Sequence, residues 1–227
     1  MRKLFTFTGA QSTGKTTLLK TVMSLYPERF EYVTEVTRRI QRMGVTINDE
    51  AKNYDLTQSL IISDHLLNYM KVHDQSDYNI RDILLDRCIV DGYIYTKYFY
   101  EQNKVSTKVM NFAEYWFKEL TCKYDVIFYT NPADVKLIDD GIRSTNNDFR
   151  NRIIELYNTE FIDKFDNICI LKGSVNERLE QMKIAMLYSK CNNCNIMVAL
   201  EDSKPVNKNK YSETAGQLCE GCYNKQK

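Results

Sequence analysis

Eight residues near the start of the chain have the types and spacing of a phosphate-binding loop. The segment from Gly9 to Thr16 reads GAQSTGKT, which is a glycine and four residues followed by Gly-Lys-Thr. Its glycines allow a turn in which successive backbone N–H groups face phosphate oxygens at the N-terminus of a helix. Lys15 is expected to neutralise the β and γ phosphates, and the Thr16 hydroxyl to ligate Mg²⁺. The predicted nucleotide-binding residues are Gly9, Gln11, Ser12, Thr13, Gly14, Lys15, Thr16 and Thr17.

The residues on both sides of this segment give it the context that such a loop requires. The run from Lys3 to Thr8 is mostly apolar, and apolar side chains at helical spacing continue from Gly14 to Leu25. A strand, the loop and a helix therefore follow one another, so a chance match in a glycine turn is the weaker interpretation.

A second group of chemically capable residues follows the apolar run from Ile83 to Leu85. Asp86 ends this predicted strand, where a carboxylate commonly holds Mg²⁺ or its water shell. Arg87 is expected beside the path of a transferred phosphoryl group. Asp91 and Tyr95 are four residues apart and share one face of a helix. They either contact the substrate, or they are a helix-start acid and a core tyrosine.

Charged residues also follow the second predicted strand, residues 30–34. Glu35 is expected to accept a proton from a substrate hydroxyl, and Arg38 with Arg39 to hold an anionic group by paired hydrogen bonds. The alternative is a solvated, charged start of a helix, since charges near helix ends are common.

The polar segment from Asp139 to Thr145 contains a glycine and follows the fourth predicted strand. Such a segment suits a lid that excludes water on closing and brings arginines to the transferred phosphoryl group. Arg143 is the first choice for that role, and Arg150, in the next helix, is the second. A plain surface loop with an Asp–Arg pair is the alternative interpretation.

Predicted strands and helices alternate along the first 188 residues. The strands are residues 3–8, 30–34, 83–85, 125–129 and 168–171. The helices are residues 14–25, 51–72, 93–100, 109–120, 148–165 and 175–188, the last with Ser174 and Glu177 as a capping pair. This alternation predicts an α/β fold, in which a mainly parallel sheet lies between two layers of helices and ligands bind at the carboxyl ends of the strands.

Composition and charge exclude several other classes of protein. Hydrophobic residues make up 43% of the chain and charged residues 27%, which is typical of a folded domain. Lys and Arg number 31 and Asp and Glu 30, so no overall field favours coating DNA or a membrane. No run approaches the roughly 20 apolar residues of a membrane span, and the N-terminus lacks the apolar region of a signal peptide. We expect a cytoplasmic protein, in the host cytoplasm if the chain is viral, with no membrane partner.

The character of the sequence changes near residue 189, which predicts a main domain of residues 1–188 and a tail of residues 189–227. Two Cys-x-x-Cys pairs in the tail have the spacing of a structural zinc site: Cys191, Cys194, Cys219 and Cys222. Bound Zn²⁺ would supply the folding energy of a small zinc ribbon that is too polar to form a core. Disulfides are the alternative, disfavoured in the cytoplasm. The basic tail either contacts nucleic acid, or caps the main domain or joins two copies in a homodimer.

Four segments taken together resemble a known family. These are the phosphate loop, the run from Glu35 to Arg38, the run from Asp86 to Asp91, and the run from Asp140 to Ser144. In the same order they are similar to P-loop kinase domains that include the nicotinamide riboside kinase domain of bacterial NAD regulators and phage-encoded relatives. The layout is more distantly similar to thymidylate and deoxynucleoside kinases. The resemblance covers about residues 1 to 187.

The resemblance implies a three-layer P-loop NTPase sandwich with a five-stranded parallel sheet, ATP as phosphate donor, and a nucleoside or nucleotide as acceptor. In the thymidylate and deoxynucleoside kinases, an acidic residue after the second strand and an Asp/Glu-Arg pair after the third serve the acceptor. The kinase relatives need no cysteine tail, so the acceptor stays open between nicotinamide riboside and a deoxynucleoside- or thymidylate-like molecule. Two other functions stay open. One is a kinase for a modified base or an end in DNA, with the tail as its grip, and the other is an ATP-hydrolysing regulatory switch.

Overall fold

The computed structural model describes residues 3–33, 36–47, 51–74, 81–134, 147–190, 197–199, 204–205 and 217–218. The chain divides into two compact units, Met1–Arg178 and Leu179–Lys227. Each unit is described by itself, and the domain boundary expected after residue 188 stays a prediction.

The first unit contains a five-stranded sheet whose strands are all parallel. The strands are β1 (Leu4–Thr8), β2 (Phe30–Val33), β3 (Asp82–Leu85), β4 (Val126–Thr130) and β5 (Ile168–Leu171), in the spatial order β2-β3-β1-β4-β5. The predicted α/β fold with a five-stranded parallel sheet is therefore confirmed. Because β1 is the central strand, the loop that follows it lies between the ends of β3 and β4.

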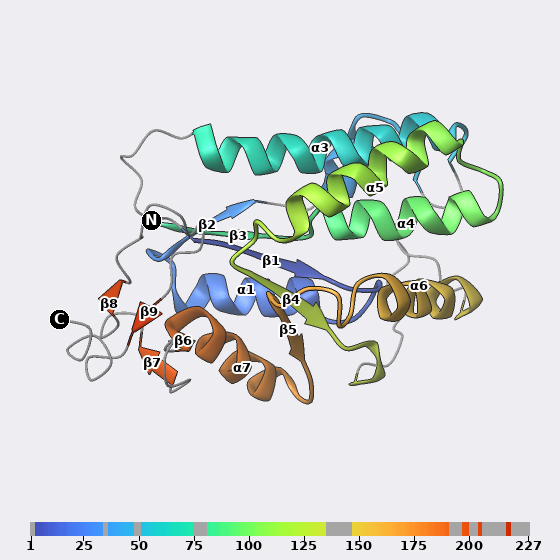
Figure 1. Ribbon diagram of the computed structural model, residues 1–227. Helices are drawn as coiled ribbons and strands as arrows, with labels where there is room; N and C mark the ends of the chain where they lie inside the picture. The colour runs from blue at the N-terminus through green and yellow to red at the C-terminus, as the bar shows by residue number, and fades with distance from the viewer. Residues whose placement is uncertain are drawn as a thin grey trace. The chain divides into compact units, whose positions relative to one another are not determined.

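Seven α-helices and a short 3-10 helix, Pro132–Asp134, connect or follow these strands in the part of the chain that the structure describes. The α-helices are α1 (Lys15–Leu25), α2 (Val36–Arg42), α3 (Tyr54–Asp74), α4 (Ile89–Glu101), α5 (Thr107–Thr121), α6 (Asn147–Glu160) and α7 (Val175–Leu187). Figure 1 shows α3, α4 and α5 on one face of the sheet and α1 on the other. None of the described helices is long and apolar enough to cross a membrane.

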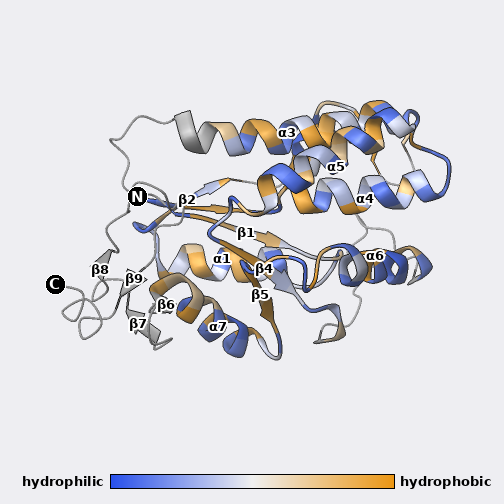
Figure 2. Ribbon diagram, in the orientation of Figure 1, coloured by the Kyte–Doolittle hydropathy of each residue, from blue (hydrophilic) through white to orange (hydrophobic). Residues whose placement is uncertain are grey.

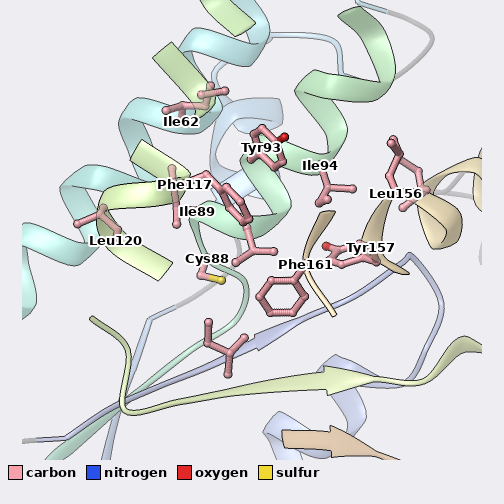
Figure 3. Packing of buried hydrophobic residues seen from close by; sticks show 14 of the residues in the cluster. Ile62, Cys88, Ile89, Tyr93, Ile94, Phe117, Leu120, Leu156, Tyr157 and Phe161 are labelled. Atoms are coloured by element: carbon pink, nitrogen blue, oxygen red, sulfur yellow. The ribbon is translucent and has the colours of Figure 1, made fainter. Parts of the chain in front are cut away.

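The largest core lies between the sheet and helices α4, α5 and α6. Side chains from separate elements meet there, among them Cys88, Tyr93, Phe117 and Phe161 (Figure 3). The rings of Tyr93 and Phe117 stack with centroids 4.2 Å apart. Apolar residues run along the strands and alternate with polar ones on the helices, as Figure 2 shows. This pattern is what a sheet buried on both faces and helices buried on one face require.

Helix α4 begins four residues earlier than its apolar spacing indicated, at Ile89 instead of Tyr93. The Cys88 backbone N–H donates to the Asp91 carboxylate, which completes a capping box at the start of the helix. Asp91 therefore lies in the first turn of α4, and a cysteine at the N-cap position concealed that start.

One unpredicted helix and one helix end are the other large differences from the sequence-based prediction, and the remaining boundaries differ by three residues or fewer. The short helix α2 was not predicted as a separate element, because its only buried residues are Val36 and Ile40 among charged neighbours. Helix α6 ends at Glu160 and not at Phe165, since the chain turns there and Asp163 takes a left-handed φ of 66°.

The second unit contains two short antiparallel strand pairs. Strand β6 (Tyr188–Lys190) pairs with β7 (Met197–Ala199), and β8 (Lys204–Pro205) pairs with β9 (Gln217–Leu218). The four tail cysteines lie outside the described residues, so the zinc ribbon stays a prediction.

Candidate nucleotide-binding site

The loop between β1 and α1 presents an uncapped helix N-terminus. Gly14 is the N-cap residue of α1, with φ 86° and no side chain bonded to the helix start. No acidic residue lies in the first turn either. The first backbone N–H groups of a helix have no partner within the helix, and the helix dipole places partial positive charge there. This end of α1 is therefore suited to an anion such as a phosphate.

Lys15 lies within the loop with only 5% of its surface exposed. Its Nζ donates to the backbone oxygens of Gly9 at 2.8 Å and Ala10 at 2.5 Å, and to the Thr13 hydroxyl at 3.1 Å. The lysine thus spans the loop from its first glycine to its fifth residue. Its positive charge is thus held within the loop, and its contact with phosphates stays a prediction.

The end of β4 packs closely against the loop. A Cβ on Gly9, whose φ is 131°, would lie 2.8 Å from Thr130 Oγ1 and 3.1 Å from the Thr130 backbone oxygen. The hydroxyls of Thr13 and Thr130 are 2.5 Å apart, and Thr130 Oγ1 also donates to the Thr8 backbone oxygen at 3.3 Å. Only glycine allows this close approach of two backbones.

Arg178, near the start of α7, is a residue of the site that the sequence prediction missed. It is 2% exposed and donates three hydrogen bonds to backbone oxygens, of Thr13, Asn131 and Gly173. Nothing in its local sequence signals this role, because Thr13 lies 165 positions away.

Asp86 follows β3 directly and is 7% exposed. Its backbone N–H donates to the Val33 oxygen at 3.0 Å, and Leu85 pairs with Thr6 on the central strand. Asp86 therefore lies beside the strand that leads into the loop, while Thr16 is half-buried in the first turn of α1.

These two oxygen-bearing residues fit a magnesium ion. Mg²⁺ is usually held by one or two protein oxygens together with phosphate oxygens and water. Within the described ranges, no group of three or more His, Cys, Asp and Glu residues could hold a metal by itself. The donor set of Thr16 and Asp86 suits an ion that arrives with a nucleotide.

A buried network joins the start of α4 to the end of β1. The Asp91 carboxylate forms an ion pair with Arg87 and accepts a hydrogen bond from the Thr8 hydroxyl at 2.8 Å. Arg87 is 8% exposed and Asp91 4%. Since the Thr8 proton goes to Asp91, the Tyr157 hydroxyl donates to Thr8 at 3.1 Å. Burial, together with the Asp91 charge, raises the pKa of Tyr157, so this donor keeps its proton.

Tyr95 contacts both the loop and Arg87. Its hydroxyl donates to Gln11 Oε1 at 3.2 Å, and the Arg87 guanidinium carbon lies 6.0 Å from the centre of its ring. The structure thus brings Asp91 and Tyr95 together with the loop, on one face of α4 as the sequence predicted. Arg87 itself has a left-handed φ of 88°, which is uncommon for a residue other than glycine.

The region after β2 is described in part. Glu35 lies outside the described residues, and Arg38 is exposed on α2. The neighbouring Arg39 makes a forked ion pair with Asp64 of α3, and its guanidinium also donates to Asn68 Oδ1 at 3.3 Å. Arg39 is thus held against α3.

Three polar residues of helix α3 are buried, and the sequence prediction did not single them out as polar: Gln58, His65 and Asn68. Gln58 Oε1 accepts a hydrogen bond from the Thr96 hydroxyl of α4 at 3.2 Å. The sequence offered one signal for them: they occur at positions of a long helix where the helical spacing predicts buried side chains. A buried polar group needs a hydrogen-bond partner, so such positions can be recognised in advance.

Arg150 lies near the end of β4. Its guanidinium donates to the Pro132 backbone oxygen at 3.1 Å, at a pocket of about 390 Å³ between β4, β5 and α6. Burial raises the pKa of Tyr129, also in this pocket, to about 12, although the Arg150 charge acts in the opposite direction. Arg143 lies outside the described residues. The structure therefore brings Arg150 to the β4 side and Arg87 to the β3 side of the loop.

The sheet order and the loop between β1 and α1 define a P-loop NTPase fold. The chain belongs to the AAA domain family, whose family model matches residues 4–178. No curated protein sequence matches the chain.

Several solved structures share the fold. A NadR protein in complex with NR has a TM-score of 0.55 and 20% identity, over 80% of this chain and 50% of that chain. NadR in complex with NAD and AMP-PNP has a TM-score of 0.53 and 17% identity, over 80% of this chain and 48% of that chain. Deoxyadenosine kinase from M. mycoides with bound dATP has a TM-score of 0.53 and 14% identity, over 79% of this chain and 97% of that chain. The chain thus spans about half the length of the NadR chains, and the resemblance predicted from the motifs is confirmed at the level of the fold.

Proposed function

We propose that this protein is an ATP-dependent kinase that phosphorylates a nucleoside- or nucleotide-type acceptor, such as nicotinamide riboside or a deoxynucleoside- or thymidylate-like molecule. The observation that carries the proposal is the uncapped start of α1 at Gly14, with Lys15 inside the same loop. A buried arginine, Arg87, lies close to that loop through Asp91 and Tyr95. An arginine near the transferred phosphoryl group serves NTP hydrolysis as well as transfer to an acceptor, so the appearance of a labelled acceptor is the result that separates the two functions.

The reaction is a transfer of the terminal phosphoryl group. An oxygen of an acceptor hydroxyl forms a bond to the γ phosphorus, the bond from that phosphorus to the β–γ bridging oxygen breaks, and ADP leaves. The acceptor hydroxyl loses its proton to the Glu35 carboxylate, the acidic residue after β2. When bound, Mg²⁺ supplies positive charge at the phosphates, and Thr16 and Asp86 would hold it.

The arginines divide between two tasks. Arg87 stabilises the transferred phosphoryl group from the β3 side, while Arg143 and Arg150 do so from the β4 side. Arg38 and Tyr95 contact the acceptor, whereas Asp91 holds Arg87 beside the transferred phosphoryl group, because the Asp91 carboxylate already binds Thr8 and Arg87. The sheet order supports the two sides, because Arg87 follows β3 and Arg150 donates to Pro132 after β4, and these two strands flank β1.

The test is transfer of γ-labelled phosphate from ATP. The acceptors are a panel of nucleosides, nucleoside monophosphates, nicotinamide riboside and single- and double-stranded DNA. We expect one small acceptor to carry the label, and Lys15→Ala to abolish transfer. Label released only as free phosphate, over the whole panel, would contradict a kinase and favour a regulatory switch. Label found only on DNA would favour the polymer-directed alternative.

The proposal for the tail is a structural zinc site formed by Cys191, Cys194, Cys219 and Cys222. Its support is the spacing of the two Cys-x-x-Cys pairs. Elemental analysis of the full chain is expected to find one zinc ion per molecule, and Cys194→Ser to lower this value. A protein without zinc that transfers phosphate normally would contradict this proposal and leave the kinase proposal intact.

A further inference from the structure

Arg178 joins three loops at the carboxyl edge of the sheet. One Nη donates to the Thr13 backbone oxygen in the phosphate loop at 2.9 Å, and the other donates to the Asn131 oxygen, after β4, at 3.2 Å. Its Nε donates to the Gly173 oxygen, after β5, at 3.0 Å. These are the three loops that follow β1, β4 and β5, so one guanidinium fixes their spacing.

The burial of this side chain indicates that its position is tightly determined. Arg178 is 2% exposed, and a buried cation is costly unless hydrogen bonds replace its water shell. The planar fork of arginine offers donors in several fixed directions, whereas lysine offers one compact charge. The bonds to Thr13, Asn131 and Gly173 use all three nitrogen atoms of the guanidinium, so the single nitrogen of lysine cannot reproduce them.

The bond to Thr13 also fixes the direction of a neighbouring amide. In a trans peptide the C=O and the following N–H point in opposite directions within one plane, and the described residues contain no cis peptide bond. When the Thr13 oxygen points at Arg178, the Gly14 N–H must point away from it. Gly14 is the uncapped N-cap of α1, with φ 86°.

We propose that Arg178 is a positioning residue for the donor phosphates. It holds the peptide between Thr13 and Gly14 so that the Gly14 N–H faces the bound phosphate, and it places a positive charge behind the loop. The loop amide contacts the phosphates, and Arg178 does not touch them. The inference deepens the proposed function and rests on it for nucleotide binding, but not for transfer to an acceptor.

The experiment compares the affinity of the full chain for ADP, inorganic tripolyphosphate and adenosine, by calorimetry with Mg²⁺ present. Arg178→Gln is expected to weaken ADP and tripolyphosphate at least about tenfold, and Arg178→Lys to weaken both by a smaller factor that stays above threefold. Adenosine binding is expected to change less than twofold. Arg152→Gln is the matched control, because Arg152 is an exposed arginine paired with Glu101 and Glu155. Equal affinities of the Arg178 variants and the unmodified protein for ADP would overturn the proposal.

A second measurement keeps the proposal testable if the variants do not fold. In the unmodified protein labelled with ¹⁵N-arginine and ¹⁵N-glycine, the Arg178 Nε–H signal is expected to exchange slowly with solvent. Tripolyphosphate is expected to shift the Gly14 amide signal more than those of Gly44 and Gly92. An unshifted Gly14 amide would overturn the proposal. A protein that binds ADP normally but labels no acceptor would instead remove the proposed kinase function and leave this inference standing.

Discussion

The Thr8 hydroxyl donates a hydrogen bond of 2.8 Å to the Asp91 carboxylate, across 83 positions of the sequence. Thr8 is the last residue of β1, immediately before the phosphate loop, and Asp91 lies in the first turn of α4. The same carboxylate pairs with Arg87. One buried acid therefore links the end of β1, at the base of the loop, to Arg87.

Asp91→Asn is expected to destabilise the protein strongly. The side chain keeps its shape, but Arg87 becomes a buried cation without its charged partner, which lowers the free energy of unfolding by about 3 kcal/mol. Urea unfolding followed by circular dichroism measures this change.

Glu114→Gln is the control for the loss of an ion pair. Glu114 pairs with Lys118 one turn along α5, and both side chains are exposed, so the expected loss is about 0.4 kcal/mol. Equal losses in the two variants would mean that the buried network around Asp91 contributes no more than a surface pair.

Gly9→Ala is expected to damage the loop through a collision with the end of β4. The new methyl group would lie 2.8 Å from Thr130 Oγ1 and 3.1 Å from the Thr130 backbone oxygen, and overpacking of this kind costs about 2 kcal/mol. Because the loop must shift to relieve it, the affinity for ADP is expected to fall by a factor of about ten. Calorimetry and thermal melting of the same sample measure the two effects.

Gly44→Ala separates the collision from the backbone conformation. Gly44 also has a left-handed φ, of 82°, but a methyl group there would meet nothing within 4 Å. This variant is expected to lose about 1 kcal/mol of stability and to bind ADP normally. Weakened ADP binding in Gly44→Ala would show that general destabilisation explains the Gly9 result.

The parts of the site that depend on neighbouring residues could be predicted from the sequence, and the parts that depend on distant ones could not. The loop from Gly9 to Thr16 and Asp86 at the end of β3 follow from local spacing and strand length. Arg178 was missed because its bonds go to backbone oxygens, and any residue type supplies such an oxygen. The pairing of Arg87 with Asp91 has helical spacing, but Cys88 in place of a usual cap concealed the helix start that brings them together.

Tyr95→Phe and Tyr95→Leu are expected to separate two roles of one side chain. Phenylalanine keeps the ring near Arg87 but loses the hydrogen bond to Gln11 at 3.2 Å, which is worth about 1 kcal/mol. We expect the KM for ATP to rise about fivefold at unchanged kcat, since that bond acts on the phosphate loop. Leucine also removes the ring, so kcat is expected to fall as well. A kcat equal to that of the unmodified protein in Tyr95→Leu would mean that the ring does not position Arg87.

The cysteines are expected to react with iodoacetamide in an order set by burial. The thiolate is the reactive form. Burial raises the pKa of Cys88 far above its ordinary value and that of Cys169 to about 11, so at pH 8 both thiols stay protonated in the folded protein. Cys122 is exposed, and among these three cysteines we expect it to be alkylated first, as measured by mass spectrometry of tryptic peptides. In urea, Cys88 and Cys122 are expected to react at similar rates, because unfolding removes the burial that separates them. Equal rates before unfolding would contradict the placement of Cys88 in the core beneath α4.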